Sequence, residues 1–266
     1  MIDRTLLINT VRQPLFHGAI SLDQMSGITA IVDEWEKRQL TDERWLACLL
    51  GQPYWESGQT MQPVREAFWM SEEWRRENLR YWPFYGRGLI QCTWEDNYRK
   101  FTVHLHDRFG IDFVANPDAM LRMDVSVAVM YEGMLRTDLH FDGFTGVALN
   151  DYFNDHTEDW YGQRRVVNGT DHAQEVGDIC KTFYIGLGGK VTGVAVYQRT
   201  LEYGDVGDDV RLVQSALQVQ GFLTGDVDGI FGRATQMAVF GFQRAKKIGV
   251  DGEVGPETRT ALNVAA

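Results

Sequence analysis

The sequence contains few cysteines, and none of them belongs to a disulfide framework. The 266 residues include only Cys48, Cys92 and Cys180, and no two of these form a C-x-x-C motif. Three cysteines cannot all pair, and Cys48 lies in an apolar run, as is typical of a small core residue. We therefore expect a reduced chain whose fold does not depend on disulfide bonds.

A long apolar run is also missing. The longest stretches, such as Leu46–Leu50, are far shorter than the roughly 20 residues that cross a bilayer. The first residues include Asp3 and Arg4 and show neither a long apolar region nor a small-residue cleavage site. We expect this end to be a helix of the mature protein and not a signal peptide, and we expect no insertion into a membrane.

Positive charge is scarce. Lys and Arg number 26 and Asp and Glu number 37, which gives a formal net charge of −11. Nucleic-acid affinity depends on cations that neutralise phosphates, so a nucleic-acid partner is disfavoured. A basic, membrane-disrupting helix is disfavoured for the same reason. A glycan partner stays possible, because glycans are recognised through hydrogen bonds and ring stacking.

No motif in the sequence predicts a metal site. His104 and His106 lie one residue apart, but no third ligand follows at a recognised spacing. We expect neither a metal nor an organic cofactor, which disfavours a zinc amidase or carboxypeptidase. A cysteine peptidase built on Cys92 is disfavoured because this residue lies within a tract that suits a carbohydrate site.

That tract, residues 85–98 (YGRGLIQCTWEDNY), is the most informative segment of the chain. Two glycines flank an arginine among aromatic residues, and polar residues follow. This composition suits a backbone that lies close to a bulky polar ligand. Two carboxylates, Glu56 and Glu66, precede it. A carboxylate pair beside an aromatic, amide-rich tract is what glycoside hydrolysis requires.

The segment from Trp45 to Tyr98 resembles the family-19 glycoside hydrolases, and in particular the endolysins with which tailed phages cut host peptidoglycan. The resemblance lies in MQPVREAFW (61–69) and RYWPFYGRGLIQCTW (80–94). Plant-type chitinases share only the YGRG…Q…NY part. A later tract at 164–169 (RRVVNG) is similar to the family's R-x-x-N-G element. Together these cover roughly residues 20–187 and imply a mainly α, lysozyme-like catalytic domain.

The resemblance implies that Glu56 is the general acid and Glu66 the base. The apolar helix before Glu56 is expected to favour its protonated form, as an acid requires. A surface glutamate at a helix end is the alternative reading of Glu56. Glu77 stays an alternative base, because plant-type chitinases have a longer insertion before their second glutamate. The family commonly has His-Glu-Thr where this chain has W-E-S at 55–57.

Further polar residues match family positions. Thr93 would help to hold the attacking water, because a hydroxyl both donates and accepts. The candidate substrate-binding residues are Tyr85, Arg87, Gln91, Asn97 and Asn168. The three amides among them could instead stabilise loops, and Arg87 could pair internally with a carboxylate beside the site. The resemblance implies inversion by a single displacement, with the carboxyl groups about 6.5–9.5 Å apart.

Apolar spacing predicts the helices of this domain. Ser21 and Gln24 have the spacing of a capping box, and a second helix should begin at Thr41. Pro53 should kink or end that helix, which leaves Glu56 in the last turn or just beyond it. Further helices are predicted at 71–80, 94–109, 124–136 and 173–184, with loops at 116–117 and 141–143 and little sheet.

The composition changes near residue 187. Glycines interrupt the helical period, and an internal repeat follows, VDGIFGRAT (227–235) and VDGEVGPET (250–258). Each copy has an Asp-Gly turn, a second glycine and a threonine that opens a helix. This half resembles the peptidoglycan-binding domain type 1, a small three-helix bundle. The predicted organisation is a catalytic domain (1–187), a linker (188–203) and a peptidoglycan-binding domain (204–266).

The resulting hypothesis is an endolysin, a lysozyme (N-acetylmuramidase) that hydrolyses the β-1,4 MurNAc–GlcNAc bond of peptidoglycan. We expect a monomer that stays in the host cytoplasm until holin-dependent release to the periplasm and cell wall. The alternatives are a chitinase acting on GlcNAc polymers and a catalytically inactive wall-binding protein.

Overall fold

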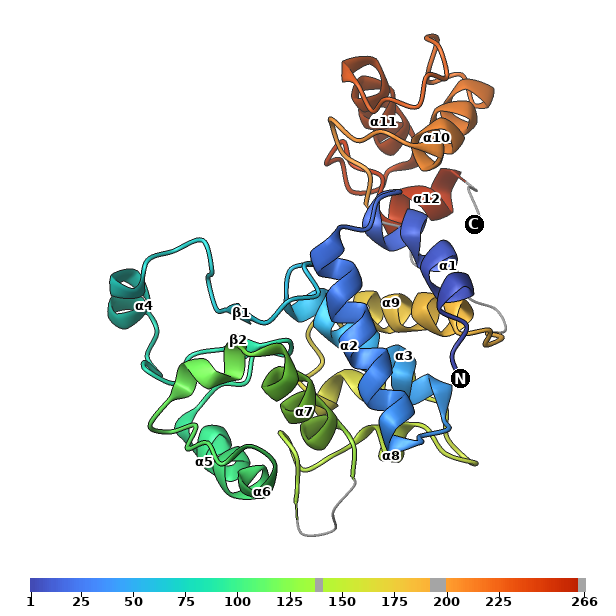
Figure 1. Cartoon of the computed structure of the whole chain (residues 1–266). Coiled ribbons are helices and arrows are strands. Elements are labelled where there is room, and N and C mark those ends of the chain that lie inside the picture. The colour runs from blue at the N-terminus through green and yellow to red at the C-terminus, as the bar shows by residue number, and fades with distance from the viewer. Residues whose placement is uncertain (137–140, 192–199, 263–266) are drawn as a thin grey trace. The chain divides into compact units, whose positions relative to one another are not determined.

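The structure, a computed structural model, describes residues 1–136, 141–191 and 200–262. The chain divides into two compact units, residues 1–11 with 20–191, and residues 12–19 with the chain from 192 onward. The described residues are mainly helical (Figure 1), which confirms the predicted fold class. Of the predicted linker, residues 192–199 lie outside the described residues. No described helix has both the length and the apolar character needed to cross a membrane.

The elements up to residue 191 are α1 (Arg4–Phe16), α2 (Leu22–Arg38), α3 (Glu43–Glu56), β1 (Val64–Arg65), α4 (Glu72–Asn78), β2 (Arg87–Gly88), α5 (Glu95–His104), α6 (His106–Phe109), the 3-10 helix η1 (Pro117–Leu121), α7 (Met123–Met134), α8 (Leu149–Tyr152), the 3-10 helix η2 (Gly162–Val166) and α9 (Ala173–Gly186). The predicted helix at 94–109 is interrupted at Leu105, between α5 and α6. The predicted loop at 116–117 was wrong, because Pro117 opens η1, where its fixed φ suits a first helical position.

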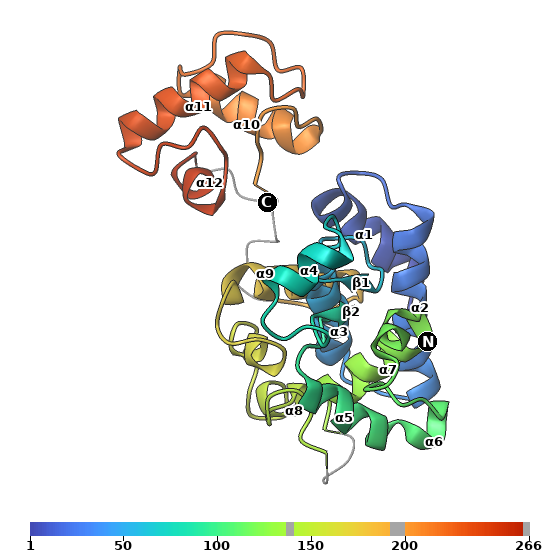
Figure 2. The same cartoon turned by 90° about the vertical axis from the view of Figure 1, so that its left-hand side faces the viewer.

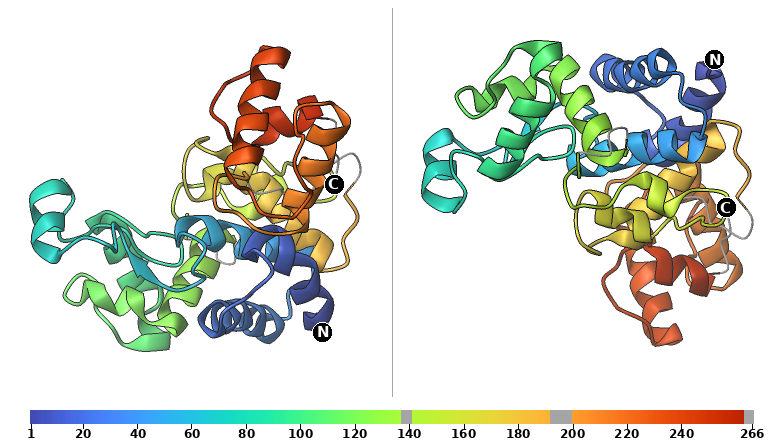
Figure 3. Two further views of the ribbon diagram at one scale, coloured as in Figure 1. Left: turned by 90° about the horizontal axis from the view of Figure 1, so that it is seen from above. Right: turned by 90° about the horizontal axis from the view of Figure 1, so that it is seen from below.

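Helix α3 is the central element of the first unit. It packs against α2, α7, α8 and α9 (Figures 2 and 3). Every residue from Leu46 to Tyr54 is buried, as expected for a helix that is enclosed on all sides. The helix begins at Glu43 and not at Thr41, because the Asp42 carboxylate caps it by accepting from the Arg44 N–H.

The end of α3 positions Glu56. Pro53 stays within the last turn of the helix, and Glu56 is the final helical residue, as predicted. Strand β1 follows and pairs with β2 in antiparallel register, Val64 with Gly88 and Arg65 with Arg87. This pairing places Glu66, directly after β1, beside the glycine-rich tract.

The connection between α3 and β1 is held against the first turns of α2. The Ser57 hydroxyl accepts a hydrogen bond from Met61 N (3.0 Å), and Gln24 Nε2 donates to Gln59 O (3.0 Å). A Cβ atom on Gly27 would lie 1.8 Å from Met61 O, so only glycine allows this approach. Gln24 also forms the predicted capping box, which the structure confirms.

In the second unit, the described residues from 200 onward form three helices, α10 (Asp208–Val219), α11 (Arg233–Lys246) and α12 (Pro256–Leu262). They enclose a core that includes Val210, Val213, Leu217, Phe231, Val239, Phe242 and Leu262. The predicted three-helix bundle is therefore confirmed.

A buried glutamine closes each copy of the internal repeat. Gln243 donates to Asp251 Oδ1 (2.7 Å), Glu253 O (2.9 Å) and Thr258 Oγ1 (3.0 Å), and it accepts from Gly252 N (2.9 Å). Gln214 makes the corresponding bonds in the first copy, to the side chains of Asp228 and Thr235 and to the backbone of residues 229 and 230. In each copy of the repeat, the Asp, the Gly and the Thr are thus all hydrogen-bonded to the same glutamine.

Candidate active site

Both candidate catalytic glutamates, Glu56 and Glu66, line one cleft of about 780 Å³. The cleft is also lined by the predicted polar residues Gln91, Thr93, Asn97 and Asn168. These residues come from the end of α3, the segment after β1, the tract after β2, and the loop after η2. The fold therefore brings together residues that are more than 100 positions apart in the sequence.

Glu56 contacts a buried arginine. Its side chain is 14% exposed, and its Oε1 lies 2.6 Å from Nη1 of Arg164, whose side chain is 2% exposed. The angles of this ion pair fall outside hydrogen-bonding geometry, so the buried Oε1 accepts no hydrogen bond from the described residues. Besides the apolar helix that the sequence indicated, Glu56 therefore has a cationic neighbour that reaches it from η2.

Arg164 is the residue whose role the sequence did not reveal. In the sequence it is only the residue before Arg165, with which the R-x-x-N-G element of the tract at 164–169 begins. Its Nη1 also donates to Gln52 Oε1 (2.6 Å) and its Nε to Asp171 O (3.1 Å), while Gln52 donates to Gln163 Oε1 (2.9 Å). The guanidinium is thus fixed by one turn of α3 and by the chain after η2.

Glu66 is held by two hydrogen bonds that reach its carboxylate. Tyr81 donates from its hydroxyl to Oε1 (2.6 Å), and Gly86 N donates to Oε2 (2.9 Å). Burial, with Glu66 nearby, raises the pKa of Tyr81 to about 12, so the phenol stays protonated at neutral pH. A Cβ on Gly86 would lie 2.8 Å from Gln91 Oε1 and 3.2 Å from Glu66 Oε2, so glycine lets the backbone reach the carboxylate.

The four polar residues also make local bonds. Thr93 Oγ1 donates to Gln91 O (2.8 Å), and Gln91 Nε2 donates to Val64 O (3.1 Å) and Gly88 O (3.0 Å). Asn97 Nδ2 donates to Thr93 O (2.8 Å), and Asn168 Oδ1 accepts from the N–H of the next residue (2.9 Å). They therefore stabilise loops and face the cleft at the same time.

Tyr85 and Arg87 do not line this cleft. Tyr85 is fully buried, and its hydroxyl donates to Glu72 Oε2 (2.9 Å). Arg87 is 4% exposed and its Nε donates to Asp118 Oδ1 (2.8 Å), so its carboxylate partner is neither catalytic candidate. Neither residue therefore contacts this cleft as predicted, and Arg87 lines a neighbouring cavity instead.

The alternative base, Glu77, is exposed on α4 and is not among the residues that line the cleft. Its neighbour Glu72 accepts from Tyr85 and from Trp82 Nε1 (3.2 Å). Burial raises the pKa of Glu72, but these bonds and the nearby Arg75 outweigh it and lower the pKa overall. Of the candidate bases, the cleft contains only Glu66 among its lining residues.

Exposed aromatic side chains surround the carboxylates. Phe68, Trp69 and Trp94 line the cleft and are 50%, 74% and 47% exposed. Trp94 has a positive φ of 75°, and its ring contacts that of Tyr81 edge-on at 5.0 Å. Flat apolar surfaces of this kind suit the faces of sugar rings. The sequence resemblance contained these residues but gave no indication that they would be exposed together.

Other chemistries find little support in the described residues. Burial raises the pKa of the Cys92 thiol to about 12, whereas a nucleophilic cysteine needs a lowered pKa. His104 lies 3.1 Å from Glu132 Oε2 and stacks on Phe141. Within the described ranges, no group of three or more His, Cys, Asp or Glu residues is placed to hold a metal ion.

Comparison with known proteins places the second unit in a class. Residues 206–262 match the family described as "Putative peptidoglycan binding domain", in agreement with the resemblance that the repeat indicated. The spore cortex-lytic enzyme of Halalkalibacterium halodurans is 39% identical over 71 residues, 27% of this chain and 22% of that protein. The chain thus spans about a fifth of that relative's length.

Solved structures that are similar include two kinds of enzyme. The endolysin of Burkholderia AP3 phage is 41% identical over 24% of each chain, with a TM-score of 0.23. Chitinase C from Streptomyces griseus HUT6037 is 17% identical and covers 71% of this chain and 77% of its own, with a TM-score of 0.41.

Proposed function

We propose that this chain is a glycoside hydrolase that cleaves the β-1,4 MurNAc–GlcNAc bond of peptidoglycan. The observation that supports this most is that Glu56 and Glu66 line a single cleft with exposed aromatic rings and amides. The same chain also contains residues 206–262, which match the peptidoglycan-binding family. Binding to the wall would raise the local concentration of the cleft near its substrate.

In the proposed reaction Glu56 protonates the leaving glycosidic oxygen. Arg164 then stabilises the carboxylate that remains, because a cation beside an anion lowers its free energy. Glu66 removes a proton from the attacking water, and its bonds from Tyr81 and Gly86 hold it in place as a carboxylate. Thr93 donates to a backbone oxygen, which leaves its own oxygen free to accept from that water.

This scheme predicts inversion at the anomeric carbon. One water must fit between the sugar and the base, so we expect the two carboxyl groups to be about 6.5–9.5 Å apart in the complex. Proton NMR of the first product formed from a defined oligosaccharide tests this, because inversion of a β bond gives the α anomer. A β product would overturn the single-displacement scheme.

The central test compares Glu56→Gln and Glu66→Gln on purified sacculi. Each substitution keeps the shape of the side chain and removes the acid or base, so turnover should fall by about 10²–10⁴-fold without unfolding. Glu77→Gln is the matched control, because Glu77 lies outside the cleft lining, and its activity should equal that of the parent. Full activity of Glu56→Gln would refute the assignment.

Product analysis decides the bond. Mass spectrometry of the digest should identify MurNAc at the new reducing end, and GlcNAc at that end would mean cleavage of the other glycosidic bond. Activity on chitin oligomers without activity on sacculi would favour a chitinase. Binding to sacculi without any product would favour an inactive wall-binding protein. Within the proposal, the enzyme acts as an endolysin that reaches the wall from the host cytoplasm through a holin.

A further inference from the structure

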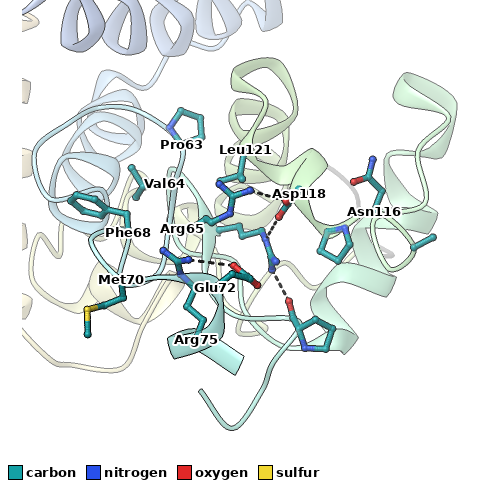
Figure 4. A pocket seen from close by; sticks show the side chains of 14 residues that line it. Pro63, Val64, Arg65, Phe68, Met70, Glu72, Arg75, Asn116, Asp118 and Leu121 are labelled. Atoms are coloured by element: carbon teal, nitrogen blue, oxygen red, sulfur yellow. Dashed lines mark hydrogen bonds and ion pairs between the residues drawn. The ribbon is translucent and has the colours of Figure 1, made fainter. Parts of the chain in front are cut away.

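A second cavity, of about 880 Å³, lies beside the cleft in the first unit. We call it the side cavity and define it by the residues of η1 and the chain before it (115–118 and Leu121) and by those of and around β1 (63–65, Phe68 and Met70). Figure 4 shows these side chains around the opening. Its volume lies in the range of ligand-binding pockets, about 300–1,000 Å³.

The side cavity adjoins the cleft. Val64, Arg65 and Phe68 line both of them, so the two-residue strand β1 forms the wall between the two spaces. A linear polymer in the cleft would pass along one side of this wall. A branch on the polymer would then reach the side cavity by crossing only β1.

Side chains of both charges line the side cavity. Asp118 bridges two guanidinium groups. Arg65 Nη2 lies 2.7 Å from its Oδ2 (Figure 4), and Arg87 Nε lies 2.8 Å from its Oδ1. The side chains of Asp118 and Arg65 are 53% and 38% exposed, so an anion and a cation both face the ligand space. Burial raises the pKa of Asp118, but the two arginines outweigh it and keep the carboxylate ionised at neutral pH.

The rest of the wall combines apolar side chains with polar ones. The apolar residues include Pro63, Val64, Phe68, Met70 and Leu121, and the polar ones are Glu72, Arg75 and Asn116. Apolar side chains beside one exposed cation, Arg65, and two exposed anions, Asp118 and Glu72, complement a short peptide with methyl side chains, carboxylates and an ammonium group. A neutral glycan such as chitin has no such branch. The stem peptide that peptidoglycan attaches to MurNAc has this chemistry and this position on the polymer.

We propose that the side cavity binds the stem peptide of the MurNAc unit whose bond lies in the cleft. The inference rests on the proposed function and adds a basis for selecting peptidoglycan over unbranched glycans. Arg65 pairs with a stem carboxylate, Asp118 accepts from the stem ammonium group, and the apolar wall contacts the alanine methyl groups.

The test blocks the side cavity and leaves the cleft unchanged. Ala115 is exposed and lines the side cavity but not the cleft, so Ala115→Trp fills the cavity from its rim. Val103→Trp, at a position 76% exposed on α5, is the matched control outside both spaces. Initial rates are measured on sacculi and on the same glycan strands after an amidase has removed the stem peptides.

Ala115→Trp should lower kcat/KM on stem-bearing glycan by about tenfold, equivalent to about 1.4 kcal/mol, and leave the rate on stripped strands unchanged. Val103→Trp should match the parent on both substrates. An equal loss on both substrates, or no loss on either, would overturn the proposal.

A binding measurement separates this inference from the proposed function. The full chain with Glu56→Gln should bind a synthetic stem tetrapeptide in calorimetry, and the same chain with Ala115→Trp added should bind it at least tenfold more weakly. Equal affinities, or no binding by the first variant, would overturn the stem-peptide site. Failure of the parent to cleave any glycan would instead overturn the proposed function.

Discussion

The most demanding prediction concerns Gln243, which is fully buried in the second unit. Gln243→Leu keeps a side chain of similar length but removes every hydrogen bond that closes the second copy of the repeat. Two of the partners that lose their bond, Gly252 N and Thr258 Oγ1, form buried hydrogen bonds with Gln243. The substitution therefore leaves at least two polar groups without a partner in the interior.

The cost follows from these two groups. Each buried polar group without a partner costs about 1–3 kcal/mol, so the free energy of unfolding should fall by about 2–6 kcal/mol. A module of about 60 residues has a total of only about 3–9 kcal/mol. We therefore expect Gln243→Leu to unfold a large fraction of the second unit at 37 °C.

Denaturant unfolding and a sacculus pull-down measure this directly. The variant should lose most of its wall-bound fraction, while its cleavage of soluble glycan oligomers stays at the parent level. Gln218→Leu is the control, because Gln218 is exposed and the bond from its side chain to Gly225 O is long at 3.2 Å. We expect a change below about 0.5 kcal/mol. A loss below 1 kcal/mol for Gln243→Leu would refute the reasoning.

Three further predictions concern the first unit. Tyr81→Phe removes a donor that positions Glu66, so kcat should fall about tenfold with little change in KM; an unchanged kcat would contradict this role. Gly27→Ala forces Met61 O away, because the added Cβ would lie 1.8 Å from it, so both melting temperature and turnover should fall; unchanged turnover would show that the connection does not affect the site. Burial raises the pKa of Glu34, but its two arginine partners outweigh burial and the net pKa is lowered. The ionised Glu34 therefore contributes its whole stabilisation above the pKa that it has in the unfolded chain, and this contribution is lost as the pH falls through its lower pKa in the folded protein. In melting scans from pH 6 to 3, the melting temperature of Glu34→Gln should therefore fall less than that of the parent.

Local sequence signals predicted the elements of the fold well. The Ser21–Gln24 capping box and the apolar periods of α3, α7 and α9 depend only on neighbouring residues, and each element was found. The short elements were missed. Helix α8 spans four residues and η2 spans five, so neither is long enough to show a period, and both are stabilised by tertiary contacts.

The sequence predicted those residues of the candidate site that belong to family motifs. Glu56, Glu66 and Thr93 came from family motifs, and the structure places them in the same cleft. The pairing of Arg164 with Glu56 was not predictable, because it joins residues that are distant in sequence. Tyr85 lies in the same tract as Gln91 but faces inward, and a sequence motif does not distinguish the inward side of a loop from the outward side.

The connection between the two glutamates has a consequence for stereochemistry. Whether a glycosidase inverts or retains depends on how far apart its carboxyl groups lie. In the proposed mechanism the two groups are Glu56 and Glu66, and the chain that joins them rests on the N-terminal end of α2, where Gly27 approaches Met61 O most closely. A helix that contributes no group to the reaction would therefore help to decide which anomer is released.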